Sequence, residues 1–200
     1  FISSQLLKDI TEGKWTEKKE AIEQIEKILN NANMKILPTG LNDLMNLIKS
    51  KLNDGNKNLV KMLVNLLTKL IEALKQGFKQ WTKNIAINLI PILSDKNQIL
   101  RKDCQVCFDK WVENTGFDSL IIHFPQFLIT DNAEMRSEIM TFIIKYKQKF
   151  TKNLGENVYK ELINPLLLCL QDRSASIRAQ AEEIIKQSLD FIQLKHYYKK

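Results

Sequence analysis

Apolar residues recur along the chain at spacings of three, four and seven positions, the period of a helix with one buried face. Ala21 and Ile25 belong to one such stripe, and Leu63 and Leu67 belong to another with the same four-residue spacing. Polar stretches interrupt the stripes, and the whole chain has only six glycines and four prolines. This pattern predicts long amphipathic helices and argues against a turn-rich β architecture.

One kind of polar segment occurs five times, as ITEGKWTEK, LNDGNKNLV, LSDKNQILR, LITDNAEMR and LQDRSASIR. The last positions of these segments are 18, 60, 101, 136 and 178, so the spacings are 42, 41, 35 and 42 residues. A period of ~40–47 residues is typical of HEAT and armadillo repeats. The apolar stripes keep a fixed register on both sides of each segment. Each repeat is therefore predicted to be a helix, a short turn and a second helix, with apolar faces that only stacking on neighbouring repeats can bury.

The predicted fold is an all-α solenoid of five HEAT-like helical hairpins, forming a single domain over residues 1–200. The predicted repeats cover residues 1–35, 36–75, 76–116, 117–150 and 151–195, and a sixth would start at Tyr197–Lys200. Asp54, Asp95 and Asp172 stand where second helices are predicted to begin, and Ser or Asn follows within two residues in several repeats. All three residue types are favoured at the N-cap of a helix.

Three prolines and two tryptophans add detail to the prediction of helical hairpins. Pro91, Pro125 and Pro165 fall inside predicted first helices, where the missing N–H and the bulk of the ring should kink each helix. Trp81 and Trp111 fall on apolar helical stripes, so we expect both in the core.

The composition limits the cellular location of the protein and the class of its partner, but it decides neither. The net charge of +7 suits an acidic partner, which could be nucleic acid, a membrane surface or an acidic protein. No apolar run approaches the roughly 20 residues that span a bilayer, so we expect no membrane insertion. Three cysteines make no disulfide framework, and the absence of a signal peptide favours a reducing, cytoplasmic location. A chain that begins at Phe1 rather than Met is expected to be part of a longer protein.

The first turn carries the most specific resemblance. The stretch LLKDITEGKWTEKKEA, with Trp15 in its polar turn, resembles the opening hairpin of the TOG domains of the microtubule-polymerase and CLASP families. The third turn, SDKNQILR, and the fifth, QDRSASIR, are similar to the D-x-x-x-x-[VI]-R pattern of that family. The resemblance covers nearly the whole chain.

This resemblance implies a flat, non-enzymatic module that binds αβ-tubulin through the edge formed by its intra-repeat turns. It implies a microtubule-associated protein that regulates microtubule growth and carries other TOG-like domains. Its expected location is on microtubules, the spindle or a microtubule-organising centre. The residues implied to contact β-tubulin are Trp15, Lys57, Asn58, Lys96 and Arg101, and those implied to contact α-tubulin are Asn132, Arg136, Arg173 and Arg178.

The residue types at the turns support this expectation but leave an alternative open. An exposed Trp is costly unless a partner covers it, and Trp is a preferred interface anchor. Stacked repeats would align their basic turn residues into a stripe that attracts an acidic partner. Arg101 and Arg178 could instead bridge Asp95 and Asp172, which lie six positions earlier.

Other functions find less support in the sequence. Cys104 and Cys107 have the spacing of half a zinc site without a second pair, no phosphate-binding loop is present, and we expect no enzymatic activity and no cofactor or metal. A basic HEAT solenoid that binds nucleic acid would need aromatic residues along the stripe, where only Trp15 occurs, so no nucleic-acid partner is expected. A scaffold or transport-receptor fragment that binds a peptide would need a polar ladder along its second helices, and none is evident.

Overall fold

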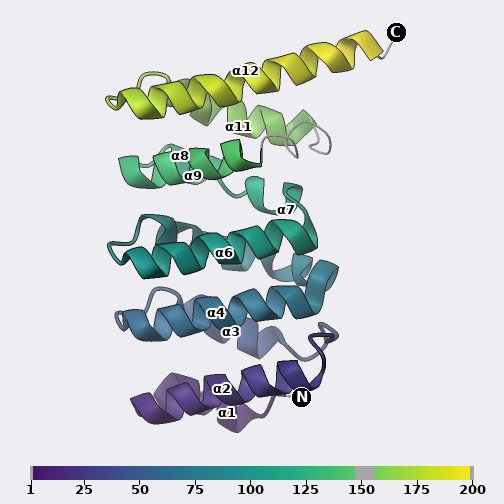
Figure 1. The fold of residues 1–200 in the computed structure, drawn as a ribbon, viewed down its shortest axis with the longest axis vertical. Coiled ribbons are helices and arrows are strands. Elements are labelled where there is room, and N and C mark those ends of the chain that lie inside the picture. Colours follow the sequence, from purple (N-terminus) through teal and green to yellow (C-terminus); the bar gives the residue numbers. More distant parts are fainter. Residues whose placement is uncertain (1, 147–155, 199–200) are drawn as a thin grey trace. The chain divides into compact units, whose positions relative to one another are not determined.

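The computed structural model describes residues 2–146 and 156–198, with side chains at 2–146 and 158–188, and every regular element in these ranges is a helix (Figure 1). The chain divides into two compact units, Phe1–Gly116 (unit 1) and Phe117–Lys200 (unit 2). Unit 1 contains α1 (Ser4–Glu12), α2 (Trp15–Asn31), α3 (Asn42–Lys51), α4 (Lys57–Leu74), the 3-10 helix η1 (Lys75–Trp81), α5 (Thr82–Leu89), the 3-10 helix η2 (Ile90–Ser94) and α6 (Gln98–Thr115). Unit 2 contains α7 (Asp118–Ile121), α8 (Pro125–Leu128), α9 (Ala133–Lys145), α11 (Glu156–Cys169) and α12 (Ala175–Tyr198).

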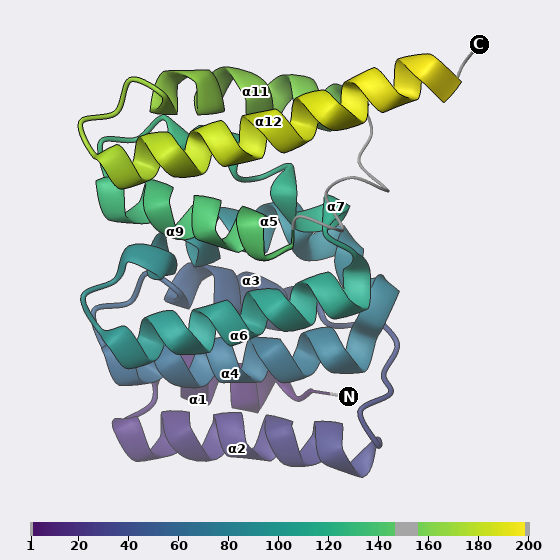
Figure 2. The same ribbon diagram turned by 45° about the horizontal axis from the view of Figure 1, so that its top comes forward.

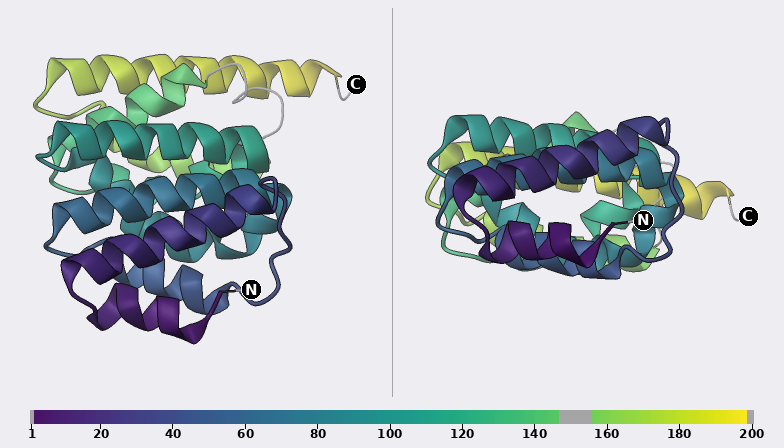
Figure 3. Two further views of the ribbon diagram at one scale, coloured as in Figure 1. Left: turned by 60° about the horizontal axis from the view of Figure 1, so that its bottom comes forward. Right: turned by 90° about the horizontal axis from the view of Figure 1, so that it is seen from below.

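Unit 1 consists of three stacked hairpins arranged in two layers of helices. The second helices α2, α4 and α6 lie side by side in one layer, and α1, α3 and α5 form the other (Figures 2 and 3). The central helix α4 packs on both α2 and α6, and ten of its 18 residues are buried, whereas α2 buries four of its 17. The width of the apolar face thus follows the number of helices that cover it.

An aromatic cluster joins the second and third hairpins of unit 1. Trp111 is fully buried and meets the ring of Phe78 edge-on, with 4.8 Å between the centroids. The indole Nε1 of Trp81 donates a hydrogen bond of 2.9 Å to Asn42 Oδ1, so its polar atom is satisfied although the side chain is buried. The prediction that Trp81 and Trp111 belong to the core is confirmed.

Unit 2 has a less regular first hairpin. Pro125 is the first residue of α8, and the predicted first helix of the fourth repeat is broken into the short helices α7 and α8 instead of being kinked. Helix α8 packs on α9 and α11, and α12 packs on both α9 and α11. Pro165 lies inside α11 as expected, whereas Pro91 is the second residue of the tighter 3-10 helix η2.

The helix–turn–helix prediction is therefore confirmed for each hairpin, apart from the break at Pro125. The predicted single domain over residues 1–200 stays a prediction, as do the repeat boundaries. The predicted start of a sixth repeat falls on the last turn of α12 and on Lys199 and Lys200, which lie outside the described residues.

Gly13 generates a stability prediction, because it ends α1 where the chain turns tightly into α2. A Cβ atom at this position would lie 2.4 Å from the carbonyl oxygen of Asp9, much closer than non-bonded atoms approach. We expect Gly13→Ala to lower the free energy of unfolding by about 1–3 kcal/mol, the usual cost of overpacking. Chemical denaturation measures this change. Gly55→Ala is the matched control, because nothing lies within 4 Å of its added methyl group, and an equal loss in both variants would contradict the close-approach explanation.

Candidate functional site at the intra-repeat turns

The second and third turns are built from the same pair of side chains. Asp54 Oδ1 accepts a hydrogen bond of 2.9 Å from the N–H of Asn56, whose own Oδ1 then accepts from the first backbone N–H groups of α4 at 3.1 and 3.3 Å. Asp95 and Asn97 repeat the arrangement before α6, with an Asp–Asn distance of 2.9 Å. Of the N-cap residue types predicted at these turns, asparagine is the N-cap, and the aspartate two positions earlier instead fixes the turn that precedes the helix.

Three arginines occupy one repeat position in the second helices α6, α9 and α12, and each ties its helix to the turn before it. The guanidinium Nη1 of Arg101, Arg136 and Arg178 donates to the backbone carbonyl oxygen six residues earlier, over 2.9 Å for Arg101 and 2.7 Å for Arg178. In the first hairpin Lys18 Nζ makes a comparable bond of 3.1 Å to the carbonyl of Thr11. These bonds satisfy backbone carbonyl groups at the end of a first helix or in the turn that follows it, so part of the predicted basic stripe has a structural role.

Ion pairs connect successive turns within each unit. In unit 1, Lys57 Nζ lies 2.8 Å from Asp95 Oδ2. In unit 2, Arg136 reaches Asp172 Oδ2 through Nε at 2.9 Å and Nη2 at 2.5 Å, and this pair is largely buried, with 14% and 8% of the two side chains exposed. An arginine carboxylate contact through two N–H groups is strong and directional, so the fourth and fifth turns are held in a fixed register.

The surroundings of the two aspartates favour their ionised forms. Burial raises the pKa of Asp95, but the hydrogen bond from Lys57 and the amide of Asn97 outweigh it, so the pKa lies below the ordinary value. The pKa of Asp172 is lowered chiefly by the hydrogen bond from the N–H of Ser174, with Arg136 adding to the effect against some desolvation. Both carboxylates are therefore charged partners of their cations at neutral pH.

The tryptophan predicted as an anchor is accessible. Trp15 is the first residue of α2, and 40% of its surface is exposed. The turn before it is held by a hydrogen bond of 2.5 Å from the N–H of Lys14 to Glu17 Oε2, a capping interaction that fixes where the indole emerges.

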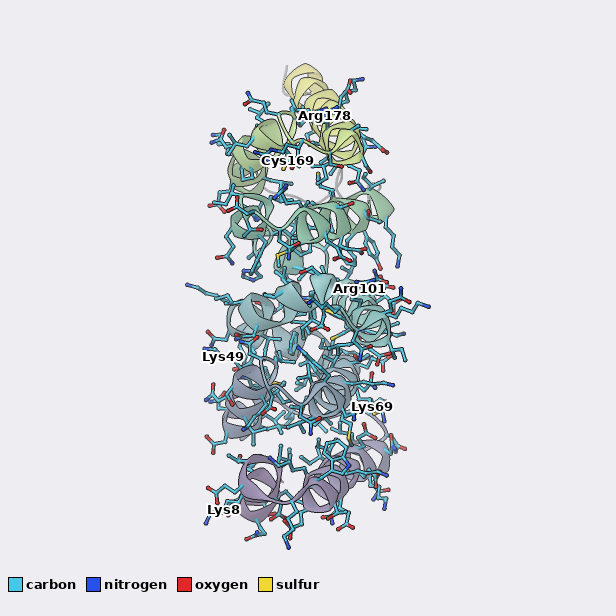
Figure 4. The ribbon with its side chains drawn as sticks, turned by 90° about the vertical axis from the view of Figure 1, so that its left-hand side faces the viewer. Lys8, Lys49, Lys69, Arg101, Cys169 and Arg178 are labelled. Carbon is cyan, nitrogen blue, oxygen red and sulfur yellow. The ribbon has the colours of Figure 1, made fainter. Side chains whose placement is uncertain are left out.

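The other predicted contact residues differ in how far they are available to a partner. The exposed residues are Lys57, Asn58, Lys96, Asn132, Arg173 and Arg178. Two of them are also bound within their own turn: the Oδ1 of Asn132 accepts the N–H of Met135 at 3.0 Å as an N-cap, and Arg178 donates to the carbonyl oxygens of Asp172 and Arg173. Figure 4 looks onto the turns of the hairpins, with Arg101 labelled in unit 1 and Arg178 in unit 2.

Within each unit the predicted residues come together at the turn ends of the hairpins. Unit 1 carries Trp15, Lys57, Asn58, Lys96 and Arg101, and unit 2 carries Asn132, Arg136, Arg173 and Arg178. Asn56 and Asn97 share an Asp-x-Asn spacing in the second and third segments, and this spacing is the sequence signal for their role as caps.

The described residues offer little support for a metal site, a reactive thiol or a membrane-spanning helix. No group of three or more His, Cys, Asp or Glu side chains in 2–146 and 158–188 is placed to hold a metal ion. Cys104 and Cys107 are fully buried, and burial raises the pKa of the Cys107 thiol to about 12, which suppresses thiolate chemistry. No helix in the described part of the chain has the length and apolar character to cross a bilayer.

Comparison with known proteins identifies the family. The family model described as CLASP N terminal matches residues 4–191. The chain belongs to the CLASP N-terminal family. The chain is 27% identical over 190 residues to protein MOR1 of Arabidopsis thaliana, a match that covers 94% of this chain and 10% of MOR1. It thus spans about a tenth of the length of the curated relatives that it matches.

Solved structures of other proteins share the fold. One is the MAST/Orbit N-terminal domain, with a TM-score of 0.75, 18% identity and coverage of 100% of this chain and 89% of that one. Another comes from work on tubulin recruitment by microtubule polymerases with TOG domain arrays, with a TM-score of 0.77, 16% identity and coverage of 94% and 40%. The predicted all-α HEAT-like solenoid and the identification as a TOG domain are confirmed.

The ion pair in unit 2 predicts a pH-dependent stability. Since the pKa of Asp172 is lower in the folded chain than its ordinary value, its contribution is fully present above the unfolded-state pKa and is lost as pH falls through the folded-state pKa. We expect Asp172→Asn to lower the free energy of unfolding at pH 7 by about 1–3 kcal/mol, because Arg136 loses its charged partner. Urea denaturation between pH 7 and pH 3 should show the difference from wild type shrinking as the solution is acidified. Asp131→Asn serves as the control, because Asp131 is exposed. If the difference in unfolding free energy between Asp172→Asn and wild type does not change with pH, the ion-pair explanation is contradicted.

Proposed function

We propose that this TOG domain binds αβ-tubulin, without catalysis, through the intra-repeat turns of its two units. The observation that carries the proposal is the accessible Trp15 in a turn that is itself fixed by hydrogen bonds. Membership of the CLASP N-terminal family supports it, as does the likeness in fold to a chain from TOG domain arrays of microtubule polymerases that recruit tubulin. The proposed role is that of one module in a microtubule-associated protein that regulates microtubule growth.

The contacts of each side chain suggest that the proposed tubulin-binding residues have different roles. Trp15 supplies apolar contact area to β-tubulin, and Lys96 and Asn58 project from the neighbouring turns of unit 1. Arg173 and Arg178 of unit 2 offer planar donors to carboxylates of α-tubulin. The remaining proposed residues, Lys57, Arg101, Asn132 and Arg136, contact tubulin and also hold the turns in place through bonds inside the domain.

The charge of the chain suits this partner. A net charge of +7 promotes encounter with an acidic protein, and this contribution weakens as salt screens it. The apolar contact of Trp15 is insensitive to screening, so binding should combine a salt-dependent and a salt-independent part.

Other TOG-like domains in the same polypeptide, and a location on microtubules, the spindle or a microtubule-organising centre in the cytoplasm, form part of the same proposal. The short match to MOR1, which covers a tenth of that protein, is compatible with one module in a larger array. In such an array each domain adds to affinity by raising the effective concentration of its neighbours at the tubulin surface.

A single substitution tests the proposed anchor. We expect Trp15→Ala to weaken tubulin binding by at least about thirtyfold, the loss that corresponds to a hot-spot tryptophan. Analytical ultracentrifugation or fluorescence titration with soluble tubulin measures the dissociation constant. Val106→Ala removes a residue of similar exposure from the middle of α6 and serves as the control. A wild-type domain that fails to bind tubulin, or that instead binds DNA with a steep dependence on salt, would exclude the proposal.

A pair of arginine variants separates binding from stability. Arg173 is exposed, so Arg173→Ala should weaken tubulin binding severalfold at low salt and leave the free energy of unfolding within about 0.5 kcal/mol of wild type. Arg136 is largely buried on Asp172, so Arg136→Ala should cost about 3–5 kcal/mol of stability by leaving a buried charge without its partner. Thermal and urea unfolding alongside tubulin titration measure both quantities. The assignment fails if Arg173→Ala destabilises the domain as much as Arg136→Ala does.

A further inference from the structure

Exposed apolar side chains gather at one place in unit 2. Ile129 and Leu168 are 60% and 61% exposed, and Leu167 and Leu170 beside them are also exposed. Isolated exposed aliphatic residues are common in soluble proteins, but a group of them in two segments that pack together marks a surface for which a partner is expected. The two segments follow α8 and end α11, which are in contact.

Ile129 and Leu168 line the same shallow depression, which has a volume of about 230 Å³. Leu128 and Cys169 also line it and are almost completely buried, so they form its base. The thiol of Cys169 lies 3.6 Å from the carbonyl oxygen of Leu128, in a hydrogen bond that holds the two segments together. The depression therefore has an apolar base and two apolar side chains that stand exposed around it.

The polar part of the lining is fixed before any partner arrives. Arg136 and Asp172 both contribute to it, and they are bound to each other through two N–H groups of the guanidinium. Arg136 also donates to the carbonyl oxygen of Thr130, which contributes to the same lining. A surface held by internal bonds loses little conformational entropy on binding, which favours affinity.

The depression belongs to the turns that the proposed function assigns to tubulin binding. Apart from Arg136, its lining comes from the end of α8 and the fourth turn (128–131), and from the end of α11 and the fifth turn (Leu168, Cys169 and Asp172). Arg173 follows Asp172 directly in the chain. A protein that contacts Arg173 at these turns has to lie next to the depression. Interfaces commonly combine an apolar pocket with a polar rim in this way, and the pocket then carries much of the binding energy.

We propose that this depression, bordered by Ile129 and Leu168, is a second apolar anchor of the domain and receives an apolar side chain of tubulin. This inference rests on the proposed function and extends it, since it gives unit 2 a contact that does not depend on charge. Asp131, exposed at the rim, accepts a hydrogen bond from an N–H or cationic group beside that side chain.

The chemistry of the lining disfavours other classes of partner. Nucleic acid would meet the carboxylates of Asp131 and Asp172 with its phosphates and would find no aromatic ring in the lining on which to stack a base. An anionic membrane surface would find no cluster of basic side chains in this lining, because its cation Arg136 is already paired with Asp172. An apolar protein side chain requires neither a base-stacking ring nor a surface free of negative charge.

The test uses the whole domain and soluble tubulin. The double variant Ile129→Ser, Leu168→Ser should bind tubulin about tenfold more weakly, because two exposed aliphatic side chains no longer contribute to apolar burial. The loss should keep the same factor between 50 and 300 mM salt, whereas the loss caused by Arg173→Ala should shrink as charges are screened. Leu37→Ser is the matched control, since Leu37 is 79% exposed but lies in the segment that joins α2 to α3, away from the turns. Leu168→Met keeps the apolar character and should bind within twofold of wild type.

Each other outcome would overturn the inference. If the double variant binds like wild type while Trp15→Ala is impaired, tubulin uses the turns without the depression, and the proposed function stands alone. A loss that vanishes at high salt, or one that Leu37→Ser reproduces, would show that the depression is not an apolar anchor. If wild-type domain forms dimers that the double variant does not, the occupant is a second copy of the chain. A wild-type domain that does not bind tubulin removes the proposed function together with the anchor.

Discussion

A helical hairpin leaves an apolar face open to water until another hairpin covers it, and this constraint organises both units. Helix α4 shows how strongly this constraint acts. Because α4 is covered on two sides, by α2 and α6, its apolar face is much wider than that of α2. The required stacking also fixes where the turns emerge within a unit, since parallel helices in a layer bring equivalent ends together (Figure 1). The residues available for binding are therefore placed by the burial of residues that never meet a partner.

Stacking brings charged turns close together, and the chain uses those charges inside the domain. Lys57 pairs with Asp95 in unit 1, and Arg136 pairs with Asp172 in unit 2. A cation that is already paired contributes less to the field at a partner than its place in the sequence implies. The excess positive charge at the turns then comes chiefly from exposed residues such as Lys96 and Arg173.

Sequence periodicity predicted the hairpins and much of the core because burial acts at every turn of every helix. It placed Trp81 and Trp111 in the core, for instance, and both are buried. The sequence could not decide between residues where two residue types satisfy the same local rule. Aspartate and asparagine both cap helices, and only the hydrogen bonds show that Asn56 is the cap and Asp54 fixes the turn.

The candidate site was harder to predict than the core. The sequence indicates turn residues such as Trp15 because their surroundings are polar, but it does not reveal which cations are engaged internally. The depression in unit 2 could not be predicted from the sequence for a different reason. Ile129 belongs to the fourth turn segment and Leu168 to an apolar run, and their place around one depression depends on how two segments far apart in the chain pack.

The ion pair of Arg136 and Asp172 shows why stability and recognition are coupled in unit 2. The pair contributes to the lining of the depression, joins two turns and is largely shielded from water. Replacing it with apolar residues could preserve stability, because a buried pair often gains little over well-packed hydrophobic groups. The replacement would nevertheless remove the bonds from Arg136 that set the register of the two turns, and with them the spacing between Ile129 and Arg173. A rigid polar network is thus the means by which an apolar contact and a charged contact are presented to one partner at a constant separation.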